Sequence, residues 1–260
     1  MAIRKGKTIS GSIDRLVYRR WRKIDVVQSA PGKGGVKQTE ATKKAASLFG
    51  RASKMSAEIR AMLDFFIINL YDGSNHNRMT KLVKSILEKC QDKTTSTFNF
   101  VEDSFERLNG LEFNANSPLT SSMKVIPECT YKNGTLTVNF PELINNQEFI
   151  FPKDTTTCVI TIGTESYYLE DNIRSIAYKL NRFEVDNQQT IIEPQTFTFA
   201  VPDGCLCLAG ITLHYYKEDR YGKTRINNRM FNPAAICGAI VTPGNFEKDP
   251  GILWTKAIGK

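Results

Sequence analysis

The stretch GKGGVKQT, residues 32–39, has the glycine and lysine content of a loop that holds phosphate groups. In such loops backbone amides surround the phosphates, a lysine reaches them, and a following Ser or Thr contacts Mg²⁺. The segment begins as one variant of this motif does, and Thr39 stands at the position of the Mg²⁺-contacting hydroxyl. However, Lys37 replaces a glycine that lets the backbone approach the phosphate, and Gln38 replaces the phosphate-binding lysine. The sequence therefore argues against nucleotide binding and predicts a hinge before a helix.

A second chemically distinctive stretch is YRRWRK, residues 18–23, where cations alternate with aromatic rings. Arginine and lysine neutralise phosphates, and aromatic rings stack on bases, so the run is a candidate for unspecific nucleic-acid binding. Two other interpretations stay open: a solvated strand edge protected by charge, and an arm that holds the acidic surface of a partner subunit. The candidate nucleic-acid-binding residues are Arg15, Arg19, Arg20, Arg22 and Lys23.

The remaining residue types favour no enzyme. The two histidines, His76 and His214, fall in a polar turn and in a strand-like run, and no G-x-S-x-G motif occurs. No pair of cysteines has the spacing of a metal site, so we expect neither a metal nor a cofactor. The cysteines are expected to be buried free thiols of a reducing compartment. They are Cys90, Cys129, Cys158, Cys205, Cys207 and Cys237.

Charge divides the chain unevenly. The net charge is +8, and residues 1–60 hold fifteen Lys and Arg against four acids, which leaves −3 for the remaining 200 residues. This asymmetry is typical of a basic arm attached to a nearly neutral body. No apolar run is long enough for a membrane helix, and we expect no membrane partner.

The first 93 residues predict an arm followed by helices. Residues 1–38 form a basic extended arm with two β-prone pieces, RLVYRRW and KIDVVQS, whose residues Leu16, Tyr18, Ile24, Val26 and Val27 are expected to share one face. Apolar spacing of three and four predicts a long helix over 39–70, with Thr39 as its N-cap, and a second helix from about 77 to 91. The short connection favours an antiparallel αα-hairpin within residues 39–93, followed by a linker at 94–121.

Residues 122–260 predict an antiparallel β-sandwich of immunoglobulin-like architecture with a C-terminal tail. About seven strand-like runs follow at sandwich spacing between 122 and 241. Asn133-Gly134 indicates a tight hairpin, and Cys205 and Cys207 are expected on the same side of one strand. The Gly/Pro-rich tail is expected to lie across the sandwich, held by Trp254. The predicted fold class is therefore α+β.

The segment from Gly11 to about residue 53 resembles the opening of an uncharacterised protein family of Bacteroidetes and their mobile elements. That family begins with a glycine-rich pattern ending in V-R-S-x-P, followed by Thr-Glu-Ala and an alanine-rich helix with a phenylalanine. Asp14 and Gln28 depart from the pattern, where the family tends to have Gly and Arg. The resemblance covers about 40 residues, implies an arm, a helix and a sandwich, and implies no activity. The matching residues are Gly11, Val17, Val27, Ser29, Pro31, Thr39, Glu40, Ala41 and Phe49.

Together these observations favour a non-enzymatic building block of an assembly, of the kind found in phage-derived particles or filaments. The arm is expected to add a strand to another copy of the chain or to a subunit of a larger assembly, with nucleic-acid binding or packaging as the alternative. The expected location is the cytoplasm or a virion-like particle. The expected contact residues are Leu16, Val17, Tyr18, Trp21, Ile24 and Val26.

Overall fold

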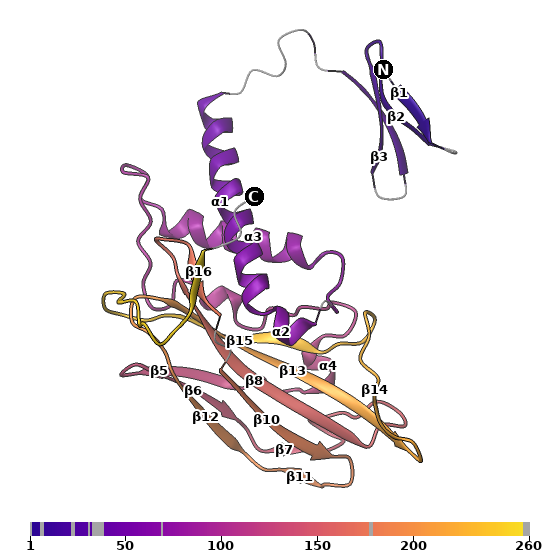
Figure 1. Ribbon diagram of the computed structural model, residues 1–260, viewed down its shortest axis with the longest axis vertical. Coiled ribbons are helices and arrows are strands. Elements are labelled where there is room, and N and C mark those ends of the chain that lie inside the picture. Colours follow the sequence, from indigo (N-terminus) through magenta and orange to yellow (C-terminus); the bar gives the residue numbers. More distant parts are fainter. Residues whose placement is uncertain are drawn as a thin grey trace. The chain divides into compact units, whose positions relative to one another are not determined.

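The computed structural model describes residues 2–5, 8–21, 24–30, 32, 39–68, 70–176 and 179–256 (Figure 1). The chain divides into two compact units, residues 1–47 and 48–260. The boundary falls inside a helix, whereas the sequence suggested a boundary near residue 38. The predicted hinge at residues 33–38 lies outside the described residues, and so do Arg22 and Lys23.

The first unit contains a four-stranded antiparallel sheet in which each strand pairs with the next along the chain. The two β-prone pieces recognised in the sequence are its third and fourth strands, and a two-residue turn with Asp14 at φ 51° joins the second strand to the third. Positive φ is tolerated by a short Asp side chain, which suits this turn. The strands are β1 Ala2–Lys5, β2 Thr8–Ile13, β3 Leu16–Trp21 and β4 Ile24–Ser29.

Three helices follow, and their ends differ from the predicted ones. Thr39 caps the first helix, since its hydroxyl oxygen accepts a hydrogen bond from the Thr42 amide at 3.2 Å, as expected. The predicted helix over 39–70 stops early and is followed by a separate short turn, after which Ile68 adopts a left-handed conformation with φ 45°. In Figure 1, α3 crosses α1, whereas an antiparallel hairpin was expected. The helices are α1 Glu40–Met62, α2 Asp64–Ile67 and α3 Asn75–Cys90.

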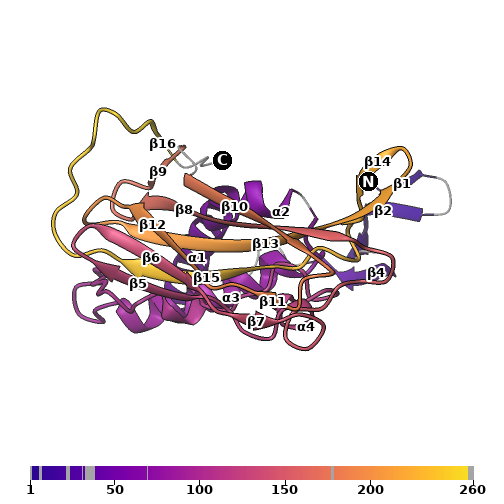
Figure 2. The same ribbon diagram turned by 90° about the horizontal axis from the view of Figure 1, so that it is seen from below.

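The second unit is a layered α+β structure with mostly antiparallel sheets. A large sheet built on β13 and β8 has the helices on one face and a small three-stranded sheet on the other (Figures 1 and 2). The large sheet contains β8 Thr157–Tyr168, β9 Ile173–Ser175, β10 Lys179–Asp186, β13 Leu206–Asp219, β14 Gly222–Arg225, β15 Ala234–Val241 and β16 Trp254–Lys256. The small sheet contains β5 Glu128–Lys132, β6 Thr135–Phe140 and β12 Gln195–Ala200. A separate ladder joins β7 Leu143–Ile144 to β11 Ile191–Ile192.

The predicted sandwich is confirmed at the level of antiparallel layers. The Asn133-Gly134 hairpin joins β5 to β6, and both turn residues have positive φ, 47° and 73°. Eleven strands lie in the described part of residues 122–241, more than the seven expected, because three of them are only two or three residues long. Such short strands carry no alternating pattern that a sequence can reveal.

Two apolar clusters form on the two faces of the large sheet. Alternation along β13 sends Leu206 and Leu208 toward the helices and sends Cys207 and Ile211 toward the small sheet, and Cys205, just before the strand, packs in the same cluster as Cys207. Cys205 and Cys207 therefore share a side, as predicted. The helix-side cluster also contains Met55, Ile59, Met62, Phe66 and Met79.

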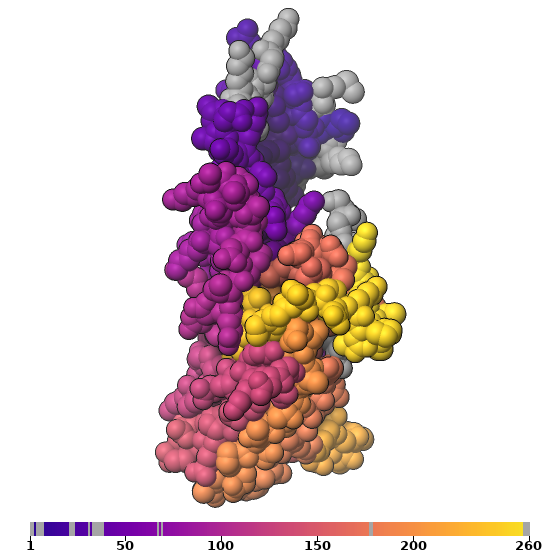
Figure 3. Space-filling model, turned by 90° about the vertical axis from the view of Figure 1, so that its left-hand side faces the viewer, coloured from indigo at the N-terminus to yellow at the C-terminus, as the bar shows by residue number. Residues whose placement is uncertain are grey.

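The segment 94–121, expected as a linker, is part of this packing. Phe105, Leu108 and Phe113 are fully buried in the helix-side cluster, and the segment contains the 3-10 helix η1 Glu106–Leu108 and the start of α4 Leu119–Ser122. The C-terminal segment lies across the sandwich surface, as expected (Figure 3). Trp254 pairs with Ser175 in β9, and its ring meets Phe246 edge-on at 4.9 Å.

Within the described ranges, no helix combines the length and the apolar character that crossing a membrane requires.

Candidate functional site

The sheet of the first unit lacks a core. Every residue of 1–47 whose exposure the structure describes is exposed or half-buried, and the first buried hydrophobic residue among those described is Ala52. Sheets normally bury one face against another layer of structure. Here large apolar side chains lie open to solvent, which marks the sheet as a candidate interaction surface. They are Ile3, Ile9, Ile13, Leu16, Ile24 and Val27.

Strand alternation divides the predicted contact residues between two faces. Register places Leu16, Tyr18 and Val27 on one face, which we call the Tyr18 face, and Val17 and Val26 on the other, the Val26 face. Ile24 lies on the Val26 face with them, opposite the backbone of Trp21. The expectation that Leu16, Tyr18, Ile24, Val26 and Val27 share one face was therefore wrong, because register and not composition assigns the faces.

The basic run is divided in the same way. Arg19 pairs with Val26 and Arg20 pairs with Asp25, so the two arginines project from opposite faces, while Arg15 lies in the turn before β3. All three are exposed. The consecutive cations of the sequence therefore do not form a single flat patch on the described sheet.

The edge strand β4 offers unpaired backbone groups of known position. The Ala30 amide donates to the Arg15 carbonyl at 2.6 Å, which extends the β3–β4 register by one pair. Hydrogen-bonded pairs alternate in antiparallel ladders, so even-numbered positions of β4 face β3. The N–H and C=O groups of Asp25, Val27 and Ser29 consequently point to the open edge.

Most long edge strands carry charges or prolines that prevent pairing with another sheet. β4 has the sequence IDVVQS, with one charged residue and three β-branched aliphatic residues among six. The opposite edge, β1, has the sequence AIRK and two cations in four residues. β4 is therefore the less protected edge and the better template for an added strand.

The second unit has both covered and open edges. Residues 102–110 bond to the outer edge of β15. The Gly110 amide donates to the Ile236 carbonyl at 2.8 Å, and the Val241 amide donates to the Glu102 carbonyl at 3.0 Å. β10 has β8 as its only strand partner among the described residues. The Asn187 amide donates to the Thr156 carbonyl at 2.8 Å, which extends the β8–β10 register by one pair. This bond shows which residues of β10 direct their backbone groups toward β8 and which direct them outward. The outward backbone groups of β10 therefore belong to Leu180, Arg182, Glu184 and Asp186. Those of Asp186 bond to Gln189, so Leu180, Arg182 and Glu184 are the positions that an added strand could pair with.

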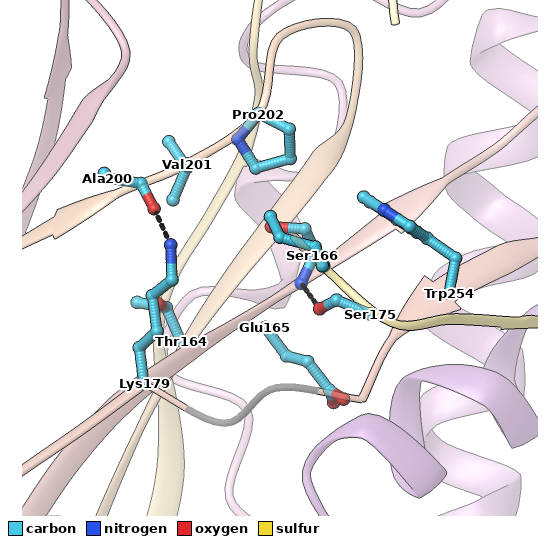
Figure 4. A pocket seen from close by; sticks show the side chains of 10 residues that line it. Thr164, Glu165, Ser166, Ser175, Lys179, Ala200, Val201, Pro202 and Trp254 are labelled. Atoms are coloured by element: carbon cyan, nitrogen blue, oxygen red, sulfur yellow. Dashed lines mark hydrogen bonds between the residues drawn. The ribbon is translucent and has the colours of Figure 1, made fainter. Parts of the chain in front are cut away.

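A cleft of ≈ 710 Å³ lies between the C-terminal segment and the end of β12. At its inner end is a small cavity of ≈ 10 Å³, about the space of one water molecule (Figure 4). The Lys179 ammonium donates to the Ala200 carbonyl at the rim, and Ser175 Oγ accepts from the Ser166 amide at 3.1 Å. The cleft lining includes the exposed carboxylates of Asp203, Glu247 and Asp249, but neither histidine.

A buried charge cluster lies on the helix side of the large sheet. Arg174 Nε is 3.7 Å from Glu58 Oε2, and Arg174 Nη1 is 3.5 Å from Glu165 Oε1. The Glu165 side chain is 0% exposed, and Figure 4 shows that it extends away from the cavity toward a helix. Burial raises the pKa of Glu165 to about 8, and the nearby Arg174 opposes this only in part. The Arg174 and Glu58 side chains are 12% and 6% exposed, so the whole cluster is largely withdrawn from solvent and affects the stability of the second unit.

Sequence reasoning missed two groups of residues. The Glu58–Arg174–Glu165 cluster joins three elements, and no local pattern indicates it. Cys129 and Cys237 lie with their Sγ atoms 3.8 Å apart, in different sheets. One signal was present: Gly238 interrupts a strand-like run, and such a glycine often marks a bulge or a close backbone approach.

Comparison of the chain with protein-family models, with curated proteins and with solved structures gives no match. Over the described part of the chain, no group of three or more His, Cys, Asp or Glu side chains is placed to hold a metal ion.

Proposed function

We propose that the protein is a non-enzymatic assembly subunit that joins to further copies of itself through strand β4. The observation that carries this proposal is that no residue of 1–47 whose exposure the structure describes is buried, although this unit contains a four-stranded sheet with apolar residues on both faces. A sheet of this size gains stability when an apolar face is covered. A phage-derived particle or filament is the kind of assembly that this arrangement suits.

The proposed contact is backbone pairing between β4 of one copy and β10 of the next. Three residues of each strand would pair: Asp25, Val27 and Ser29 on β4, and Leu180, Arg182 and Glu184 on β10, where the outward groups of Asp186 already bond to Gln189. The contact joins two different surfaces, so it is head-to-tail and extends into a filament or closes into a ring. The antiparallel sandwich, which we expect to be immunoglobulin-like, is the body that receives the strand.

Side chains add specificity to this pairing. Residues 1–47 hold twelve Lys and Arg against three acids, a net charge of +9, and β10 carries the exposed acids Glu184 and Asp186 beside Lys179 and Arg182, with Glu184 2.6 Å from Lys223. Opposite charges accelerate encounter and fix the register of a contact more than they add affinity. Val17, Val26 and Ile24 on the Val26 face, and Leu16 and Tyr18 on the Tyr18 face, supply the apolar contacts.

The test replaces an outward donor of β4 with proline. Val27→Pro removes an N–H that points away from β3, so the ladder of the first unit persists, while pairing with another copy is blocked. We expect sedimentation velocity to show large species for the wild-type protein and only monomer for Val27→Pro. Large species of unchanged size in the variant would contradict the proposal.

Matched variants separate the backbone from the side chain. Val27→Ala keeps the outward N–H and is expected to assemble, whereas Arg182→Pro on β10 is expected to abolish assembly and Arg182→Ala to retain it. Val26→Pro breaks the β3–β4 ladder itself and shows the effect of a damaged first unit. If Arg182→Pro assembles normally, β10 is not the receiving strand.

Nucleic-acid binding is the second candidate function, favoured by the net charge of +9 and by the exposed Arg15, Arg19 and Arg20. If the sheet binds a phosphate backbone, affinity for single-stranded or double-stranded DNA falls steeply with salt. A filter-binding titration at two salt concentrations measures this slope. Replacement of Arg19 and Arg20 with alanine should reduce the slope by about two if both arginines contact phosphates.

A further inference from the structure

Cys129 and Cys237 form a thiol pair that the fold brings together from distant parts of the chain. Cys129 is on β5 of the small sheet, and Cys237 is on β15 of the large sheet, 108 residues later. The Cys129 thiol donates to Cys237 Sγ across 3.8 Å. All six cysteines are free in this structure.

A β-bulge directs Cys237 toward Cys129. Along the β13–β15 ladder, Ala209 pairs with Gly238 and Gly210 pairs with Ile236, so Cys237 has no partner on β13. The extra residue changes the alternation, so that Ile236 and Ala239 pack on the helix side while Cys237 packs on the small-sheet side. Bulges re-aim side chains in this way.

Gly238 provides the space for this approach. A Cβ atom at position 238 would lie 2.5 Å from Cys129 Cβ and 2.6 Å from its Sγ, which is too close for any side chain. Cys129 therefore lies directly on the backbone of β15. The bulge and the glycine act together: the first turns the Cys237 thiol inward, and the second admits the Cys129 side chain.

We infer that Cys129 and Cys237 are a site of reversible oxidation, at which a peroxide forms a disulfide between the two sheets of the sandwich. Cys129 is half-buried and Cys237 is 5% exposed, so the oxidant reaches Cys129 first. The hydrogen bond with Cys129 and burial raise the pKa of the Cys237 thiol, so Cys237 is protonated at neutral pH and serves as the resolving thiol.

The chemistry balances with hydrogen peroxide as the oxidant. The Cys129 thiolate attacks one peroxide oxygen, the O–O bond breaks, and the thiolate becomes a sulfenic acid as hydroxide leaves. The Cys237 sulfur then attacks the Cys129 sulfur, gives up its proton, and displaces the hydroxyl group as water. In total, two thiols and one peroxide give one disulfide and two molecules of water.

The test is oxidation of the full-length protein with hydrogen peroxide, followed by peptide mapping without reduction. We expect loss of two of the six free thiols, a peptide pair that joins residues 129 and 237, and recovery of both thiols on addition of dithiothreitol. The closed loop is long, so oxidation is expected to raise Tm by roughly 5–15 °C.

Single variants identify the pair. Cys129→Ser and Cys237→Ser should each abolish the loss of two thiols and the rise in Tm, while Cys90→Ser, at another half-buried cysteine, should retain both effects. A cross-link at any other pair, a disulfide between two chains, or oxidation of Cys129 to a sulfinic acid without a cross-link would overturn the inference. Mapping of the wild-type protein decides the matter even if a variant does not fold.

Discussion

Strands β4 and β13 use similar residues in opposite ways. β4 is rich in Ile and Val, yet Ile24 is 60% exposed and Val27 is 53% exposed. β13 contains ten consecutive buried residues, Leu206–Tyr215, which pack on both faces of the large sheet. The second unit thus has two covered sheet faces, and the first unit has none among its described residues. A β-prone sequence specifies a strand in both units, but only the presence of further layers determines whether the strand is buried.

Because of this difference, the two units have different roles: the second supplies stability, and the first supplies the surface for the proposed contact. Burial of apolar surface stabilises a fold by about 25 cal/mol per Å² removed from water, so residues of the second unit carry the free energy of unfolding. The apolar residues of the first unit contribute little until another surface covers them. They are therefore available for the proposed contact between copies.

The largest expected effect is the difference in free energy of unfolding between a leucine-to-alanine variant in the second unit and one in the first. Leu213→Ala removes a fully buried side chain from the small-sheet side and should lower the free energy of unfolding by about 3–5 kcal/mol. Leu16→Ala removes a side chain that is 42% exposed and should change it by less than about 0.5 kcal/mol in dilute protein. Urea denaturation measures both. Equal costs for the two variants would remove the contrast between the units.

The next largest effect is the pH dependence of stability that Glu165 gives to the second unit. Its pKa is raised to about 8 in the fold, above the ordinary value of 4.5, because burial disfavours the carboxylate. The unfolded chain binds fewer protons than the folded chain between these values, so stability falls as pH rises through this window and reaches its lower level above pH 8. Glu165→Gln should lessen the fall, which is about 2 kcal/mol between pH 6.5 and 8.

Between pH 6.5 and 8, the pH dependence of stability reports Glu165 without the contribution of the buried His214. Burial, Arg225 and Arg182 lower the pKa of His214 to about 4, so its contribution is present above pH 6.5 and is lost as pH falls toward 4. Urea denaturation at several pH values gives the slope of the free energy of unfolding against pH for the wild-type protein and for Glu165→Gln. A variant with the wild-type slope above pH 6.5 would show that Glu165 does not cause the loss.

Local chemistry made part of the fold predictable. Asn133-Gly134 specifies its hairpin because both residues accept positive φ, and Thr39 specifies a helix start because its hydroxyl replaces a missing backbone acceptor. Cys205 and Cys207 were predicted on one side from the period of a strand, and they pack in one cluster although β13 begins only at Leu206. Each of these features depends on neighbouring residues only, so a sequence is sufficient.

Features that depend on distant partners were not predictable. The assignment of Leu16 and Ile24 to opposite faces depends on the β3–β4 register, and the Glu165 environment depends on Glu58 and Arg174 from other elements. The Cys129–Cys237 pair depends on a bulge that shifts one strand by a single residue. Composition identified the basic arm, but it could not show which of its groups face outward.

Amide hydrogen exchange of β4, measured by NMR at low and high protein concentration, tests the central claim most directly. The amides of Val26 and Gln28 face β3 and should be protected at both concentrations, whereas those of Asp25, Val27 and Ser29 face the open edge. We predict that the outward amides exchange rapidly in dilute protein and become protected as concentration rises. Rapid exchange of the outward amides at every concentration would contradict strand addition through β4.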